Sequence, residues 1–286
     1  MADSLPLVTT QWLAGRLGDP QVRIVDIRSA VDGGARAAYE QAHVAGAVHT
    51  DYAKDGWRAT KGMATGLLPD AATLARLIGR LGVTPSHQVV IVSAGTSAGD
   101  FSAAARTYWT FKTAGHGAVS ILDGGMAAWA GEGGAVEAGP GAPPVSAAYP
   151  VKLDLTWRCE CAAVERAAAD GSAVLLDTRS VAYFEGREKS PQALRAGRVP
   201  GSLHLDHASA FDKGALRLKP LAELARMFAN VPDKAVVSYC NTGHQAATSW
   251  FILSELLHRP GATLYDGSMS EWTEDPAREV ATGPAE

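Results

Sequence analysis

One cysteine lies at the point where a strand-like run of apolar residues gives way to a polar loop and then to an apolar helical stretch. The segment "VVSYCNTGHQAATSWFILSEL" runs from Val236 to Leu256 and contains Cys240 directly after the apolar run. A thiolate is a nucleophile, and a loop that leads into a helix N-terminus presents N–H groups and a positive dipole end to an anion. Gly243 can adopt a positive φ or allow close backbone approach. The segment therefore predicts a reactive cysteine whose charge is stabilised by main-chain amides.

Two other interpretations of Cys240 follow from the same residues. Cysteine is often buried, so Cys240 can instead be a small residue that closes the strand. A cysteine phosphatase would carry an arginine a few residues after the cysteine, where it clamps the phosphate through two hydrogen bonds. The seven residues that follow Cys240 contain no arginine. The sequence therefore disfavours phosphoryl chemistry and favours a reactive thiol in another reaction.

The chain contains one long internal repeat. In the first half "VRIVDIRS" precedes "HVAGAVHTDY", and in the second half "AVLLDTRS" precedes "RVPGSLHLDH". "ILDGGMAAW" matches "LYDGSMSEW", and the segment around Cys240 has a counterpart without cysteine, "VSAGTSAGDFSAA". A repeat of this length exceeds that of solenoid proteins and indicates a duplicated domain. We predict domains over residues 1–134 and 151–286, joined by a linker over 135–150 that is rich in Gly, Pro and Ala; the alternative is a long surface loop within one domain.

Short apolar runs alternate with helical patterns in both halves. This alternation predicts an α/β fold with two tandem domains, each a mostly parallel sheet flanked by helices. The expected strands cover residues 22–27, 89–93, 119–122, 173–177, 235–239 and 263–265. The expected helices cover residues 71–81, 101–112, 161–169, 221–229 and 246–257. Ligands of such sheets bind beyond the carboxyl ends of the strands, and Cys240 is expected there.

Composition and charge exclude several classes of protein. The chain has 286 residues, of which 47% are hydrophobic, enough for two ordinary domains with cores. Lys and Arg number 26 against 30 Asp and Glu, a net charge of -4, so nucleic acid and anionic membranes are not expected as partners. The first residues lack the apolar stretch of a secretory signal. Three cysteines are too few for a disulfide framework, and we expect a reducing cytoplasm.

The sequence resembles the rhodanese family, the thiosulfate and 3-mercaptopyruvate sulfurtransferases, in its tandem-domain form. The resemblance rests on "HVAGAV", "RVPGSL", "YCNTGHQA" and "LYDGSMSEW", and it covers nearly the whole chain. It implies two rhodanese-like domains, of which only the second is catalytic. It also implies that Cys240 takes sulfur from thiosulfate or 3-mercaptopyruvate as a persulfide and passes it to cyanide or a thiol. No metal or organic cofactor is needed.

The resemblance also assigns residues to the site. The loop residues are expected to bind the anionic sulfur donor: Asn241, Thr242, Gly243, His244 and Gln245. An outer cationic contact is expected from Arg187, because Tyr183 occupies the position where the family carries an arginine; the alternative for Arg187 is a surface position. Asp177 and Arg179 are expected to form a structural pair at the strand end. The loop departs from both substrate patterns of the family, and we favour thiosulfate over 3-mercaptopyruvate or a role as persulfide carrier for a partner protein.

Other polar residues do not form a convincing site in the sequence. His43, His204 and His207 lack further ligands at a spacing suitable for a metal. Cys159 and Cys161 lie two residues apart and therefore do not share a helical face, so packing or surface positions are favoured over a redox role. Trp129, Trp250 and Trp272 are expected in the core.

Overall fold

The protein consists of two compact units, each built around a parallel sheet. The computed structural model describes residues 5–32, 34–141, 143–146, 148–212 and 216–284. The first unit takes the chain up to residue 57 together with residues 69–154 and 212–218, and the second takes the remainder. Residues 58–68 therefore belong to the unit formed by the second half of the sequence. Positions 142 and 147 of the predicted linker lie outside the described residues.

The first unit contains a five-stranded parallel sheet in the order β1-β8-β7-β2-β4. Its strands are β1 (Leu7–Val8), β2 (Val22–Asp26), β4 (Val48–His49), β7 (Gln88–Val92) and β8 (Val119–Leu122). Its helices are α1 (Thr10–Ala14), α2 (Ala35–Gln41), α3 (Ala71–Arg80), α4 (Ala98–Thr113) and α5 (Gly125–Gly131), with a 3₁₀ turn at Ala30–Asp32. A small antiparallel pair joins β3 (His43–Val44) to β9 (Val136–Glu137), which lies in the predicted linker.

The second unit contains a four-stranded parallel sheet in the order β11-β10-β12-β13. Its strands are β10 (Val174–Asp177), β11 (Leu203–His204), β12 (Val236–Tyr239) and β13 (Ala262–Leu264). Its helices are α6 (Cys161–Asp170), α7 (Val181–Phe184), α8 (Leu221–Met227), α9 (Ala246–Phe251) and α10 (Ser268–Trp272). A π-helical turn, Ile252–Leu256, continues α9, and 3₁₀ turns cover Leu155–Trp157 and His207–Ala210.

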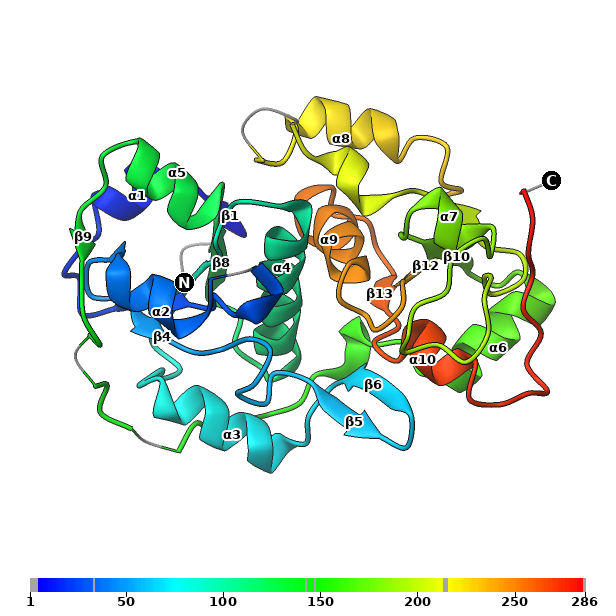
Figure 1. Ribbon diagram of the computed structural model, residues 1–286, viewed down its shortest axis with the longest axis horizontal. Coiled ribbons are helices and arrows are strands. Elements are labelled where there is room, and N and C mark those ends of the chain that lie inside the picture. Colours follow the sequence, from blue (N-terminus) through cyan, green and yellow to red (C-terminus); the bar gives the residue numbers. More distant parts are fainter. Residues whose placement is uncertain (1–4, 33, 142, 147, 213–215, 285–286) are drawn as a thin grey trace. The chain divides into compact units, whose positions relative to one another are not determined.

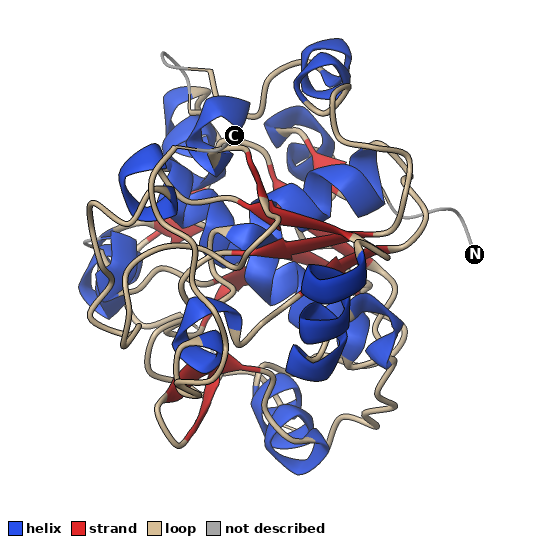
Figure 2. Ribbon diagram, turned by 90° about the vertical axis from the view of Figure 1, so that its right-hand side faces the viewer, coloured by secondary structure: helices blue, strands red, loops and turns tan. Residues whose placement is uncertain are grey.

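The observed architecture confirms the predicted α/β fold class. Figure 1 shows the elements in chain order, and Figure 2 shows the strands lying between helices. The six expected strands and five expected helices are all present, with ends displaced by a few residues. The shortest elements were not expected, among them β1, β4, β11, α7 and α10. Among the described residues, no helix has the length and apolar character needed to cross a membrane.

The helix after Cys240 is buried over its whole length, which fixes the loop that precedes it. Every residue of α9 is buried, as its apolar sequence predicts. Trp250 is fully buried, donates through Nε1 to the carbonyl of Ala262 at 3.2 Å, and meets the ring of Trp157 edge-on at 6.1 Å between centroids. The core positions expected for Trp129 and Trp272 are also observed, and both indoles donate to a backbone carbonyl.

A hairpin from the first half of the sequence forms part of the second unit. Strands β5 (Ala59–Lys61) and β6 (Ala64–Leu67) pair antiparallel, and β6 packs against α10. In Figure 1 the hairpin is cyan and the neighbouring α10 is red, far apart on the colour scale. This exchange of segments was not predicted from the sequence.

In the first unit, the loop equivalent to that of Cys240 is closed by its own carboxylate. Asp100, in the first turn of α4, accepts hydrogen bonds from the N–H of Thr96 (2.7 Å) and of Ser97 (2.9 Å) and from both of their hydroxyls. The Ser97 hydroxyl in turn accepts from the N–H of Asp100, which completes a capping box. Asp100 is fully buried, so the loop amides between β7 and α4 surround an internal anion.

Replacing this carboxylate tests its structural role. Asp100→Ala leaves several donors without an acceptor, and we expect the free energy of unfolding of the first unit to fall by about 2–3 kcal/mol. Asp100→Asn retains one acceptor oxygen and should cost less. Urea unfolding followed by tryptophan fluorescence measures both variants. An unchanged unfolding midpoint in Asp100→Ala would contradict the role assigned to this carboxylate.

Candidate active site

Cys240 lies at the carboxyl end of β12, an interior strand of the second sheet. Strand β12 pairs with β10 on one side and with β13 on the other. Cys240 follows Tyr239, the last residue of β12, and is 1% exposed, whereas most residues of the next loop are half-buried. The loop runs into α9, so the sulfur lies where strand, loop and helix meet, as the sequence predicts.

The hydroxyl of Ser268 binds two backbone N–H groups of the Cys240 loop. The Oγ of Ser268 accepts hydrogen bonds from the N–H groups of Cys240 and Gly243, both at 3.0 Å, and donates to the carbonyl of Tyr265 at 2.8 Å. Ser268 has a φ of +51°, an uncommon conformation for a residue with a side chain. In the first unit, Gly125 occupies the matching position of the repeat with a φ of +57°. The second unit thus keeps a strained serine where glycine is the easier choice, and its hydroxyl spans the loop.

Helix α10 also holds the loop through its first backbone amides. The N–H of Met269 donates to the carbonyl of Cys240 at 3.1 Å, and the N–H of Ser270 donates to the carbonyl of Asn241 at 2.9 Å. Gly243 has a φ of +66°, the positive value that its position predicted. The loop is therefore bound to α10 along both edges of its backbone.

Several donors of the loop remain available. Within the part of the chain that the structure describes, the backbone N–H groups of Asn241, Thr242 and Gln245 have no hydrogen-bond acceptor. All three residues are half-buried. N–H groups that precede a helix and have no protein acceptor are suited to an anionic ligand.

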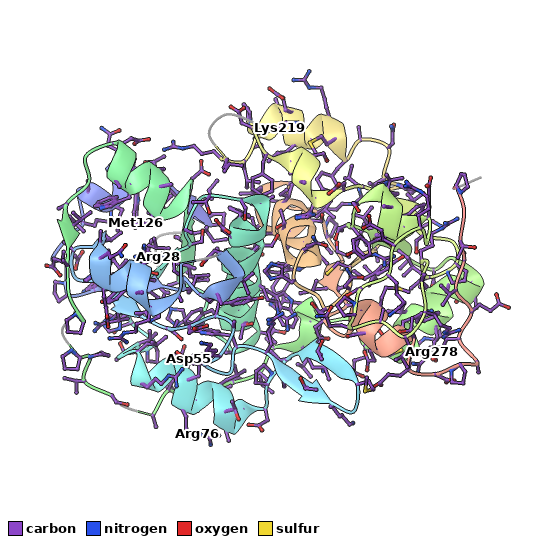
Figure 3. The ribbon with its side chains drawn as sticks, viewed as in Figure 1. Arg28, Asp55, Arg76, Met126, Lys219 and Arg278 are labelled. Atoms are coloured by element: carbon purple, nitrogen blue, oxygen red, sulfur yellow. The ribbon has the colours of Figure 1, made fainter. Side chains whose placement is uncertain are left out.

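Arg179 brings a positive charge to the site. Its guanidinium binds both carboxylate oxygens of Asp177, the pairing predicted from the sequence, and its Nη1 also donates to the side-chain oxygen of Asn241 at 3.2 Å. Burial would lower the pKa of Arg179, but hydrogen bonding to Asp177 and the charges of Asp177, Tyr239 and Cys240 raise it. The first unit repeats the pair as Asp26 and Arg28, the latter labelled in Figure 3.

The structure places Arg187 and Tyr183 after the Asp177–Arg179 pair, within the second unit. Tyr183 belongs to α7, and Arg187 follows it with a side chain that is 59% exposed. The Nε of Arg187 donates to Glu185 at 2.7 Å. Within the described residues, no hydrogen bond or ion pair joins either side chain to the Cys240 loop. Their participation in the site stays a prediction.

The remaining cysteines are held as neutral thiols. Burial raises the pKa of Cys159 to about 11. Burial also raises the pKa of Cys161, against the opposing charge of Arg278, which is labelled in Figure 3. A raised pKa disfavours the thiolate form that a nucleophilic cysteine needs.

The three histidines considered from the sequence hydrogen-bond to backbone carbonyls. His43 binds the carbonyl of Tyr39 at 2.8 Å, and His204 and His207 bind those of Arg179 (2.7 Å) and Thr178 (3.2 Å). Among the described residues, no group of three or more His, Cys, Asp or Glu side chains is arranged to hold a metal ion.

The model of the rhodanese-like domain matches the chain twice, over residues 9–132 and 161–275. The protein belongs to the rhodanese family. Among its relatives, a thiosulfate sulfurtransferase of Corynebacterium glutamicum is 33% identical over 97% of this chain and 90% of its own length. The sulfur carrier protein TtuD of Thermus thermophilus is 29% identical over 93% of each chain. These rhodanese relatives match the whole arrangement of two domains.

A solved structure of the family agrees in fold with this rhodanese. SseA of Escherichia coli, described with the mechanism of 3-mercaptopyruvate sulfotransferases, is 27% identical. It superposes with a TM-score of 0.79 and covers 93% of this chain and 99% of its own. The family predicted from the sequence is therefore confirmed.

Ser268 gives a direct test of the loop architecture. Ser268→Ala removes the acceptor shared by two buried N–H groups, and we expect the free energy of unfolding to fall by about 2–3 kcal/mol. Ser268→Gly loses the same hydroxyl but relieves the left-handed backbone, which is worth about 1 kcal/mol. The glycine variant should therefore be the more stable of the two in urea unfolding. Wild-type stability in Ser268→Ala would show that the hydroxyl does not hold the loop.

Proposed function

We propose that the protein is a sulfurtransferase that moves sulfane sulfur from thiosulfate to cyanide or a thiol through a persulfide on Cys240. One observation carries this proposal. Cys240 lies at the end of an interior strand, beside the cation of Arg179, in a loop whose amides at Asn241, Thr242 and Gln245 have no acceptor in the described structure. Such a setting stabilises negative charge on a sulfur atom and on an anion that binds next to it.

The reaction proceeds in two balanced steps. The Cys240 thiolate attacks the outer sulfur of thiosulfate, a sulfur–sulfur bond forms, the bond between the two sulfurs of thiosulfate breaks, and sulfite leaves with the electron pair. Cyanide then attacks the outer sulfur of the persulfide, thiocyanate leaves, and the Cys240 thiolate is restored. Loop amides and Arg179 stabilise the negative charge that remains on sulfur in each step. No redox partner is required, because the sulfane sulfur passes between nucleophiles.

The first unit supports the use of this loop for an anion. Its equivalent loop, between β7 and α4, surrounds the carboxylate of Asp100 with backbone and hydroxyl donors. The second unit has the same strand, loop and helix but no acidic residue in its loop, which reads Cys240 to Gln245. We infer that the anion supplied by the chain itself in one unit is supplied by the substrate in the other.

Thiosulfate is proposed as the preferred donor, with 3-mercaptopyruvate as the alternative. The relative from Corynebacterium glutamicum is named for thiosulfate, and SseA is described with 3-mercaptopyruvate. In this chain Asn241 accepts from Arg179, which brings positive charge to the loop and suits a dianionic donor.

All three cysteines are free thiols, consistent with the reducing cytoplasm proposed from the sequence.

A role as persulfide carrier is the second candidate. It is favoured by the relative TtuD, which is named as a sulfur carrier protein. A carrier would receive its outer sulfur from a partner protein and would turn over thiosulfate slowly by itself. Kinetics of the purified chain with thiosulfate and with 3-mercaptopyruvate, each with cyanide, separate the candidates.

The nucleophile is tested by exchanging cysteines. Cys240→Ser should lower thiocyanate formation about a thousandfold or more, as removal of a nucleophile does elsewhere. The double variant Cys159→Ser and Cys161→Ser is the matched control, because burial raises the pKa of both thiols and keeps them neutral at pH 7–8. This control should retain kcat within about twofold. Thiocyanate formation by Cys240→Ser at a rate near that of the wild type would refute the proposal.

Arg187 is proposed as the outer cationic contact for the donor. Arg187→Ala should then raise the KM for thiosulfate about tenfold, the effect of one lost charged hydrogen bond, with little change in kcat. Glu185→Ala is the matched control, since it removes the present partner of Arg187 and leaves the guanidinium free to bind thiosulfate. An unchanged KM in Arg187→Ala excludes this arginine from the donor site.

A further inference from the structure

The hairpin β5–β6 is anchored to the segment that holds the Cys240 loop. The Glu274 carboxylate accepts from the N–H groups of Met63 and of Ala64, the latter at 2.8 Å. Asp266 accepts from the N–H of Leu68 at 2.6 Å and also binds the guanidinium of Arg158. Two carboxylates that flank α10 thus fix the turn and the end of the hairpin.

A third connection leads from the hairpin to the loop itself. The Ser270 hydroxyl accepts from the N–H of Thr65 at 3.2 Å, and the hydroxyl oxygen lies 3.0 Å from the carbonyl oxygen of Thr65. The N–H of Ser270 donates to the carbonyl of Asn241 at 2.9 Å. Ser270 therefore links Asn241, the residue after Cys240, to Thr65 of the hairpin.

Gly66 lies directly against the backbone of the Cys240 loop. It has a φ of +88°, and a Cβ placed on it would lie 2.1 Å from the carbonyl oxygen of Thr242 and 2.9 Å from the carbonyl carbon. Both are backbone atoms, so no side-chain rotation relieves the overlap. Any residue other than glycine must displace either the hairpin or the peptide between Thr242 and Gly243.

That peptide is restrained at both ends. Its carbonyl oxygen, on Thr242, lies against Gly66, and its N–H, on Gly243, donates to Ser268 at 3.0 Å. The two groups belong to one planar unit, so a push on the oxygen tilts the N–H away from Ser268. The same tilt redirects the neighbouring amides of the loop.

We infer that the hairpin Ala59–Leu67 is a positioning element of the Cys240 site and that Gly66 is its positioning residue. The inference rests on the proposed function and assigns to it a segment encoded in the other half of the chain. Gly66 acts through the Thr242 peptide. Gly66 fixes the plane of the peptide between Thr242 and Gly243. The orientation of this peptide sets the direction in which the N–H groups of the loop point toward a bound thiosulfate.

The test is Gly66→Ala in the full-length protein. We expect the KM for thiosulfate to rise about tenfold, because one hydrogen bond to the anion is lost or misdirected, while kcat per active Cys240 changes little. The active fraction is counted by stoichiometric alkylation of Cys240 in the background that lacks the other two cysteines. A merely structural defect would lower the active fraction, and with it the apparent kcat, and would leave the KM unchanged.

Gly201→Ala is the matched control in the second unit. Gly201 has a φ of +74°, so alanine strains its backbone in the same way, but among the described residues the added Cβ would have no atom within 4 Å. This variant should lose stability while its KM stays within about twofold of the wild type. Equal KM values for wild type, Gly201→Ala and Gly66→Ala would overturn the positioning role.

A second variant serves if Gly66→Ala does not fold. Glu274→Ala removes the acceptor for the turn of the hairpin without adding any atom near the loop. We expect a KM about threefold above that of the wild type, because a loosened hairpin restrains the Thr242 peptide less. An unchanged KM would overturn the inference. Activity of the wild type and of Cys240→Ser tests the proposed function separately, so the two failures are distinguishable.

Discussion

The convergence of two loop amides on the hydroxyl of Ser268 is the constraint on which the site depends. A loop of polar residues at the end of a buried strand has many conformations, and its N–H groups are costly to bury without acceptors. The Ser268 hydroxyl accepts hydrogen bonds from two of them, at Cys240 and Gly243, while the Ser268 backbone adopts the left-handed conformation. The buried helix α9 and the first amides of α10 complete the frame. Once these positions are fixed, the conformation of the rest of the loop, which Arg179 contacts through Asn241, is restricted as well.

Comparison of the two units shows how one scaffold holds an anion in two ways. Each has a parallel sheet, an aspartate–arginine pair that begins at the end of a strand, and a loop of backbone N–H donors before a helix. In the first unit Asp100 fills the loop from within and makes it a capping box. In the second the acidic residue is missing and a cysteine begins the loop. Differences within the segment between strand and helix therefore separate a closed structural turn from the proposed ligand site.

Local patterns carried most of what could be predicted from the sequence. Consecutive residues were enough to predict the strand before Cys240, the polar loop, the glycine conformation at Gly243 and the buried helix α9. The internal repeat indicated the duplicated α/β fold, and the quoted motifs indicated the family. Ser268 was missed because its role depends on a contact with a residue 28 positions away. A signal existed, since serine replaces glycine in "DGSM" relative to "DGGM". The hairpin contacts were beyond reach, because Thr65 and Ser270 are 205 positions apart and neither segment has a distinctive pattern.

The placement of the hairpin explains why a half without a reactive cysteine is retained. A duplicated gene can lose the copy that performs no chemistry, unless the surviving copy has come to depend on it. Residues 58–68 are encoded in the first copy and are built into the second unit. Deleting the first half would remove this hairpin from the second unit, so the two copies are inherited together. Selection for sulfur chemistry therefore also acts on codons that lie far upstream of the cysteine. A break in the gene at the apparent domain boundary would separate two segments of the same structural unit.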